Sequence, residues 1–271
     1  MLRLTLVAVL AAFATLPAFA QVRIGLMVSA TGPTSAIGIP QKNTGDLLPR
    51  RIGATTIEYV QLDDGGDTTR AVQNVKRLVQ QDNVDALIGP STTPNALAIL
   101  DVIAEAGVPM MATVGTSAVV EPLDAKKRWV FKTTQNDDLI AAALIRHMQK
   151  TGVKSVGFVG FNDPYGENWL KVFGGLAEKA GLRVAPVERY NRTDQSVAGQ
   201  TLKLIAAKPD AVLVAGVGGP GVLPQITLRD QGYKGTIYQT HGVATDDFIR
   251  LGKEKVEGTV LAAGPMLVID E

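Results

Sequence analysis

The sequence contains no cysteine and only two histidines in 271 residues. The absence of cysteine excludes disulfides, thiolate metal sites, cysteine nucleophiles and a lipidated N-terminal cysteine, and two histidines leave little for a zinc site. An excess of one charge is also lacking, because 27 basic residues face 26 acidic ones. Nucleic acid and an anionic membrane surface are therefore not expected as partners. The rest of the composition, with 46% hydrophobic residues, 28 Gly and 14 Pro, supports one large core or two ordinary ones.

Residues 1–20 have the pattern of a secretory signal peptide. Arg3 is their single charge, an apolar run covers residues 4–16, and Ala18 and Ala20 are small residues that fit a signal-peptidase site. An uncleaved anchoring helix is the alternative, but this run is short for a hydrocarbon core of ~30 Å. We expect cleavage after Ala20. Because no later segment is long and apolar enough to span a membrane, we expect a soluble periplasmic product.

Beyond the leader, short β-branched segments alternate with segments of helical period. Strands are expected at residues 22–28, 56–62, 86–88, 109–113, 155–161, 183–188, 211–215 and 236–239. Helices are expected at residues 68–81, 94–106, 138–150, 167–180 and 196–207, with Asp67 as an N-cap and Gly107 after a helix end. This alternation predicts an α/β fold with doubly wound parallel sheets that helices cover on both faces.

The second half of the chain repeats the plan of the first at an offset of 125 residues. Residues 85–88 (Asp-Ala-Leu-Ile) correspond to residues 210–213 (Asp-Ala-Val-Leu), and the same offset carries Gly107 to Gly232 and Thr116 to His241. Chance similarity of βα units is the alternative. We expect two lobes, residues 21–135 and 136–262, joined by a hinge near residues 129–135. A cleft between their strand ends is then the expected ligand site.

Two hydroxyl-rich loops of the first lobe are candidates for binding an anion. Ser91, Thr92 and Thr93 stand where a helix begins, and unpaired amide N–H groups at a helix start favour a carboxylate or phosphate. Val114 and Thr116 lie in the loop at residues 113–117, after the next strand. Each loop could instead be a simple helix cap or a polar turn.

Two residues of the second lobe could complete the site. Tyr165 could cover a ligand with its ring or donate its hydroxyl, or it could pack in a surface turn. His241 lies opposite Thr116 by the internal repeat, although a lone loop histidine is usually a satisfied polar residue. His147, inside a helix, is expected to be structural.

The glycines at 216, 218 and 221 form a G-x-G-x-x-G after a strand, which on paper is a dinucleotide fingerprint. We expect Pro220 and Pro224 to disturb the helix start that would receive a pyrophosphate, and no acid ends the following strand. No G-x-S-x-G or H-E-x-x-H motif occurs, so a nucleophile–base pair has almost no candidates. Neither enzyme activity nor a cofactor or metal is expected.

Several segments, taken in order, resemble the type I periplasmic solute-binding proteins, in particular the branched-chain amino acid (Leu/Ile/Val) substrate-binding family of ABC transporters. The resemblance covers essentially the whole mature chain. It is carried by Val22-Arg23-Ile24-Gly25, Thr31-Gly32-Pro33, Leu62-Asp63-Asp64, residues 88–94, Val108-Pro109-Met110-Met111, residues 129–133 and Tyr165-Gly166-Glu167.

The resemblance implies a two-lobe receptor that closes on a small molecule by hinge bending and delivers it to an inner-membrane ABC permease. It implies that the Ser91–Thr92 loop, Val114 and Thr116 grip the ligand carboxylate and that the Tyr165 ring covers the ligand. A ligand-sensing receptor of the same fold without transport, for an amide or an organic acid, is the alternative.

This sequence also departs from the family pattern. His241 stands where leucine-binding members place an acid for the α-ammonium, Val217 and Gly218 replace a second aromatic, and Ile37 replaces a tyrosine. Residues 38–53 are expected to form a shortened helix region, broken by Pro40, Gly45 and Pro49. An unpaired ammonium in a closed cleft would be costly. We therefore expect a ligand with a carboxylate but no clamped α-ammonium, such as a keto, hydroxy, aliphatic or aromatic acid, or an amide.

Family members continue beyond the point at which this sequence stops. Residues 263–271 are expected to begin the return to the first lobe, which would leave that lobe incomplete at its C-terminus. An exposed sheet edge and marginal solubility are the expected consequences.

Overall fold

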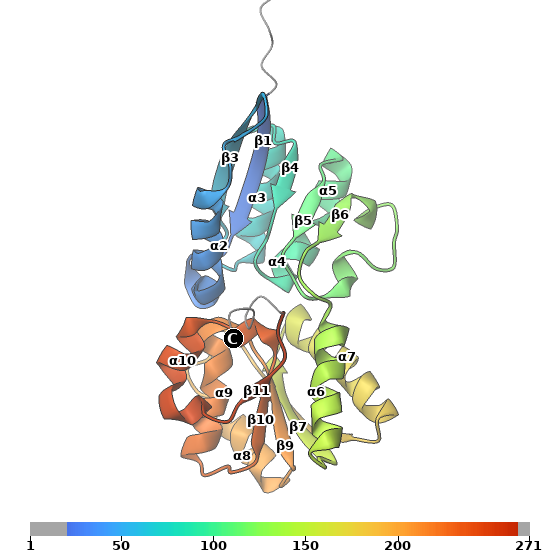
Figure 1. Ribbon diagram of the computed structural model, residues 1–271, viewed down its shortest axis with the longest axis vertical. Helices are drawn as coiled ribbons and strands as arrows, with labels where there is room; N and C mark the ends of the chain where they lie inside the picture. The colour runs from blue at the N-terminus through green and yellow to red at the C-terminus, as the bar shows by residue number, and fades with distance from the viewer. Residues whose placement is uncertain (1–20, 265–271) are drawn as a thin grey trace, which may run out of the picture.

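The computed structural model describes residues 21–264, which form two lobes stacked along the long axis of the molecule (Figure 1). The strands of the first sheet come from residues 21–132, and those of the second sheet from residues 155–261. The expected signal peptide and residues 265–271 lie outside the described part. Within that part, no helix combines the length and the apolar character that crossing a bilayer requires.

The first lobe contains a six-stranded sheet in the order β2-β3-β1-β4-β5-β6. Its strands are β1 (Gln21–Val28), β2 (Arg51–Ile52), β3 (Thr55–Asp63), β4 (Ala86–Ile88), β5 (Met110–Ala112) and β6 (Val130–Lys132). All neighbours are parallel except β2, which runs antiparallel to β3. The helices are α2 (Ser35–Leu47), α3 (Thr68–Gln80), α4 (Thr93–Ala98) and α5 (Leu100–Ala106).

The second lobe contains a five-stranded parallel sheet in the order β11-β10-β9-β7-β8. Its strands are β7 (Ser155–Phe161), β8 (Arg183–Tyr190), β9 (Ala211–Ala215), β10 (Thr236–Gln239) and β11 (Val260–Leu261). Its helices are α6 (Asp137–Lys150), α7 (Pro164–Lys179), α8 (Ala198–Ala206), α9 (Gly218–Asp230) and α10 (Asp246–Gly252). Strands β7 and β9 are buried along their whole length, as expected for central parallel strands covered on both faces.

The two lobes share one strand order, which supports the predicted internal repeat. Numbered within each lobe and without β2, both sheets follow the doubly wound order 2-1-3-4-5. Asp85 accepts a hydrogen bond from the N–H of Arg23 at 2.8 Å, and Asp210 accepts those of Lys154 and Ser155 at 2.9 and 2.8 Å. The two aspartates therefore tie the start of the first strand to the third strand in both lobes.

Three expectations about helices need correction. The helix predicted at residues 94–106 is divided into α4 and α5 at Ile99. Helix α2 continues through Pro40 and Gly45, because a proline in the second turn removes only one early backbone hydrogen bond and Gly45 lets the helix pack closely on Leu26. Helix α9 likewise begins at Gly218 and contains Pro224, so the prolines do not prevent its formation.

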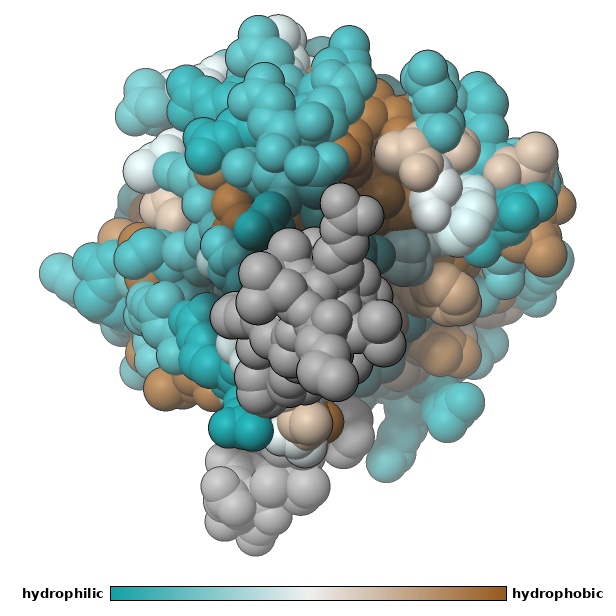
Figure 2. All heavy atoms as spheres, turned by 90° about the horizontal axis from the view of Figure 1, so that it is seen from above, coloured by the Kyte–Doolittle hydropathy of each residue, from teal (hydrophilic) through white to brown (hydrophobic). Residues whose placement is uncertain are grey.

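Strand β6 forms one edge of the first sheet and, within residues 21–264, pairs only with β5. Phe131 on this strand and Met111 on β5 are 54% and 37% exposed. The view from above shows hydrophobic residues beside a largely hydrophilic surface (Figure 2). Among the described residues, β6 is thus an edge strand with a free pairing side, and it carries one exposed apolar side chain while its neighbour β5 carries another.

Candidate ligand-binding site between the lobes

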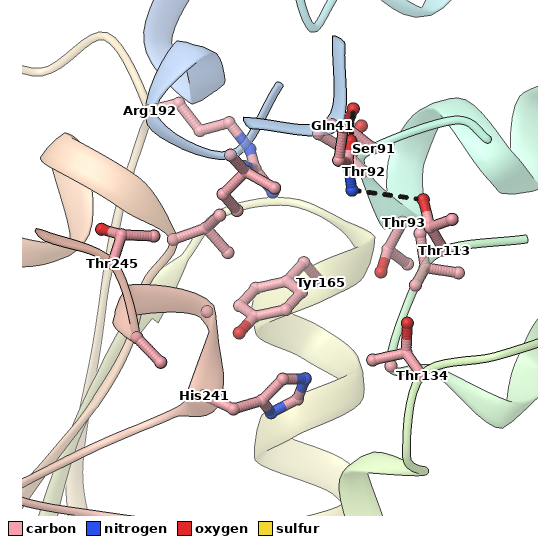
Figure 3. A pocket seen from close by; sticks show the side chains of 16 residues that line it. Gln41, Ser91, Thr92, Thr93, Thr113, Thr134, Tyr165, Arg192, His241 and Thr245 are labelled. Carbon is pink, nitrogen blue, oxygen red and sulfur yellow. Dashed lines mark hydrogen bonds between the residues drawn. The ribbon is translucent and has the colours of Figure 1, made fainter. Parts of the chain in front are cut away.

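The strand ends of the two lobes face each other across a cavity of about 230 Å³. This volume lies below the ~300–1,000 Å³ typical of drug-sized ligands, so the cavity fits a small molecule. The first lobe and the start of the crossover line it with Ile37, Gln41, Ser91, Thr92, Thr93, Thr113, Val114, Gly115 and Thr134. The second lobe lines it with Tyr165, Arg192, Val217, His241, Gly242, Ala244 and Thr245 (Figure 3).

A hydrogen-bonded network fixes the first-lobe wall. The Ser91 hydroxyl accepts the N–H of Ser29 at 2.9 Å and donates to Oε1 of Gln41. The Gln41 amide then donates to Oγ1 of Thr113 at 3.4 Å, which is the dashed line in Figure 3. Gln41 of α2 thus connects the loop after β4 with the loop after β5.

Thr92 and Val114 present different groups to the cavity. Thr92 is the N-cap residue of α4, but its side chain makes no capping bond, and its buried Oγ1 has no hydrogen-bond partner within residues 21–264. Val114 is buried and contributes an apolar surface. The first lobe therefore offers a hydroxyl, the N–H groups at the start of α4 and an aliphatic side chain to a bound molecule.

Thr116 takes a different place from the other predicted residues. It is fully buried and does not line the cavity, and its hydroxyl accepts the N–H of Ala118 at 3.2 Å as a cap of the following 3-10 turn. Gly115, one residue earlier, provides the lining instead. The structure therefore brings together Ser91, Thr92, Val114, Tyr165 and His241, and it places Thr116 behind the wall.

Tyr165 contributes its ring rather than its hydroxyl. The hydroxyl lies 2.8 Å from Oγ1 of Thr240 and 3.4 Å from the carbonyl of Gly216, so protein atoms already satisfy it. Burial raises the pKa of Tyr165 well above its usual value. Of the two roles predicted for Tyr165, the contacts favour a covering ring.

His241 is a neutral side chain at the cavity wall. Burial lowers the pKa of His241 to about 4, and the nearby Lys132 ammonium acts in the same direction. Asp137 lies behind it, with Oδ1 3.9 Å from Nε2 of His241. Burial raises the pKa of Asp137 to about 7, opposed by the charge of Lys132 and by the amide of Asn168, which donates to Oδ2 at 2.7 Å.

The Lys132 ammonium fixes the segment that joins the lobes. Its Nζ donates to the carbonyls of Gly115 and Thr134 at 3.3 and 2.7 Å and to Oδ1 of Asn136 at 2.6 Å. One nitrogen atom therefore holds the loop after β5 together with the crossover from β6 to α6.

The charges of the lining side chains favour an anionic group. Among residues 21–264, no Asp or Glu lines the cavity, and Arg192 is the only lining Arg or Lys. Because none of these lining side chains is a carboxylate, an ammonium group would find no counter-ion in this wall.

The sequence profile of the periplasmic binding protein family matches residues 21–267, which is most of the chain. The chain belongs to this family. The glycines at 216 and 221 in this periplasmic binding protein serve close packing, because a Cβ on either would meet the backbone of the other. They do not form the open turn that a dinucleotide site needs.

Relatives of known type agree with the predicted resemblance to the branched-chain amino acid group. A Leu/Ile/Val-binding protein, BraC3, from Rhizobium johnstonii is 29% identical over 94% of this chain and 70% of its own. An extracellular ligand-binding receptor from Rhodopseudomonas palustris HaA2 has a TM-score of 0.89 and 47% identity, covering 91% of this chain and 68% of that one. A solute-binding protein of an ABC transporter from R. palustris, solved with 4-hydroxybenzoate, has a TM-score of 0.75 and 20% identity, covering 82% and 62%.

The sequence did not indicate Gln41 or Arg192 as lining residues of this periplasmic binding protein. Arg192 lies four residues after the expected strand at residues 183–188 and two residues after the observed end of β8, where the rule for ligand sites at strand ends could have found it. Gln41 lies one helical turn after Ile37, a position already noted as a departure from the family pattern. Its role became visible only through its contacts with Ser91 and Thr113.

Proposed function

We propose that the protein is the extracytoplasmic solute-binding component of an ABC importer and binds a small carboxylate between its lobes. The main observation behind this proposal is that loops far apart in the sequence line one cavity, with Ser91, Thr92, Tyr165 and His241 among the lining residues. Family membership and the binding proteins among its relatives support this role. The protein acts by binding and release, without a chemical step.

The ligand carboxylate would lie against the first-lobe wall. The N–H groups at the start of α4, with the Thr92 hydroxyl, would complete its hydrogen bonds. The Tyr165 ring, Ile37 and Val217 would pack on its hydrocarbon part. Thr116 would act from behind by fixing the loop that carries Val114 and Gly115. We expect an affinity of roughly micromolar order once ordering costs are subtracted.

The charge pattern favours an acid without an α-ammonium. A Leu/Ile/Val-binding name and a complex with 4-hydroxybenzoate occur among the similar proteins, so zwitterions and simple acids are both represented. With no lining carboxylate in residues 21–264 and a neutral His241, we favour the simple acids: keto, hydroxy, aliphatic or aromatic.

Isothermal titration calorimetry with a matched panel tests this proposal. Leucine and valine are compared with their 2-keto and 2-hydroxy acids, with aliphatic and aromatic acids, and with the corresponding amides. We expect heat from acids and little from the amino acids. Tight binding of leucine or valine with no response to the acids would exclude the proposed ligand class. Recovery of the acid unchanged after incubation, by mass spectrometry, checks that binding is not followed by turnover.

Export can be tested separately. Expression of the full chain in a Gram-negative host should give a periplasmic product whose first residue is Gln21, as measured by intact mass. A full-length cytoplasmic product would contradict cleavage after Ala20.

A further inference from the structure

Arg192 lines the cavity, and two nitrogen atoms of its guanidinium group are buried without a hydrogen-bond partner among residues 21–264. It follows β8 in the segment before α8, and its side chain is 14% exposed. Nε donates to Oδ2 of Asp163 at 2.6 Å, but neither Nη1 nor Nη2 has a hydrogen-bond partner among residues 21–264. Two buried donors without acceptors are unfavourable unless another group completes them.

The guanidinium is held in a fixed position. Its carbon lies 4.2 Å from the centre of the Phe161 ring and 5.8 Å from that of Tyr165. Asp163 is fixed in turn, because its Oδ1 accepts the N–H groups of Tyr165 and Gly166 at the start of α7. Figure 3 shows Arg192 reaching toward the middle of the site above the Tyr165 ring, on the side opposite the first-lobe threonines.

We propose that Arg192 binds a second acidic group of the ligand, which makes the solute a dicarboxylate with an acid at each end. The inference rests on the proposed function, in which the first-lobe wall holds one carboxylate. Nη1 and Nη2 form a planar fork that matches the two oxygens of a carboxylate. Because this fork belongs to the second lobe, the two acid groups would each be held by a different lobe.

The surroundings of Arg192 suit a carboxylate rather than a neutral group. Asp163 already accepts from Nε, so an apolar group of the ligand would leave both remaining nitrogen atoms unpaired, and a single neutral oxygen atom would not match both of them as a carboxylate does. The α7 N–H groups satisfy the other oxygen of Asp163, which reduces its repulsion of a second acid. A diacid would also join the lobes through two ion-assisted contacts, one on each side of the cleft.

Calorimetry with two matched pairs of probes tests the proposal: pentanoate against glutarate, and benzoate against terephthalate. In the wild type, we expect each diacid to bind about tenfold or more tightly than its monoacid. This is the gain in affinity that one additional hydrogen bond between charged groups provides. Arg192→Met should weaken diacid binding by about tenfold and change monoacid binding by less than about threefold. Arg192→Lys, which keeps the charge but loses the fork, should lie between them.

Arg189→Met is the matched control, since Arg189 is exposed and pairs with Glu167 outside the cavity wall. It should leave the diacid preference unchanged. Equal weakening of monoacid and diacid in Arg192→Met would place Arg192 on the first carboxylate and overturn the proposal. Preference of the wild type for 4-hydroxybenzoate over terephthalate would overturn it too.

The comparison separates two kinds of failure. If the wild type binds monoacids as well as diacids, the second acidic group is excluded and the proposed function stands. If it binds none of these probes and none of the keto, hydroxy, aliphatic or aromatic acids of the first panel, the proposed function fails with it. Should Arg192→Met not fold, the wild-type pairs and Arg192→Lys still decide the question.

Discussion

The carboxylate of Asp137 lies 3.9 Å from Nε2 of His241, yet the two side chains do not form an ion pair near neutral pH. Burial lowers the pKa of His241 to about 4 and raises that of Asp137 to about 7. Between these values both groups are neutral. This pair of side chains therefore gains a negative charge as pH rises and Asp137 ionises.

Replacing Asp137 by Asn should change how stability depends on pH. The folded-state pKa of Asp137 lies above its unfolded value of 3.8, so its contribution is present at low pH and is lost as pH rises to about 7. The pKa of His241 is shifted in the opposite direction, so the contribution of His241 to the free energy of unfolding is lost as pH falls from about 6.5 to 4. From pH 4 to 8, Asp137→Asn should gain up to roughly 4 kcal/mol relative to the wild type, at ~1.4 kcal/mol per unit.

Urea denaturation at a series of pH values measures this difference. Asp138→Asn is the matched control, because Asp138 is the next residue and is exposed. Its profile should follow that of the wild type. Parallel profiles for Asp137→Asn and the wild type would contradict a buried, proton-binding Asp137.

Replacing Tyr165 separates the roles of its ring and its hydroxyl. Tyr165→Phe removes the contact with Thr240 but keeps the ring, so we expect about 1 kcal/mol of lost stability and less than about threefold change in affinity. Tyr165→Ala removes the surface over the ligand and should weaken binding by about tenfold or more. Calorimetry with the acid that binds most tightly checks this order. Equal loss in both variants would instead assign the hydroxyl to the ligand.

Replacing Ser91 by Ala should affect both the fold and the site. The buried N–H of Ser29 would lose its acceptor and Gln41 its donor, at a cost of about 1–3 kcal/mol. Because Gln41 also orients Thr113, ligand affinity should fall by about tenfold. Ser196→Ala serves as the control for thermal unfolding and calorimetry, because Ser196 is exposed outside the cavity wall and, within residues 21–264, its hydroxyl accepts only the N–H of Ala198, at 3.4 Å. Wild-type affinity in Ser91→Ala would show that the network does not shape the binding wall.

The paired aspartates Asp85 and Asp210 should act locally. Asp85→Ala should accelerate amide hydrogen exchange in β1 and leave β7 unchanged, and Asp210→Ala should do the reverse. The effect should be larger for Asp210, which accepts two backbone N–H groups and the Ser155 hydroxyl. Exchange mass spectrometry resolves the two strands. A uniform increase over both lobes would contradict the role of these residues as separate ties.

The strands could be predicted well because their sequence pattern and their burial have the same cause. The segments at residues 155–161 and 211–215 are continuous apolar runs, and both are buried throughout. Helix α2 could not be predicted as well. Its proline and glycine residues suggested a break, whereas packing against the first sheet maintains the helix.

The candidate site was predicted at the level of loops more reliably than at the level of side chains. Equivalent positions in a repeated fold fix where the backbone goes, which is why His241 and Thr116 both follow the fourth strand of their lobes. They do not fix which way a side chain points, and only His241 reaches the cavity. Arg192 was missed because its function depends on unpaired nitrogen atoms, which only the contacts of Asp163 and Phe161 reveal.

The three hydrogen bonds of Lys132 have a consequence for how the lobes move. We expect a rotation of one lobe against the other to change backbone torsions in the crossover, and the bonds from Nζ to Thr134, Asn136 and Gly115 to oppose that change. The crossover should therefore be a stiff hinge. It should limit the angle between the two lobes to a narrow range and keep the two walls of the cavity facing each other.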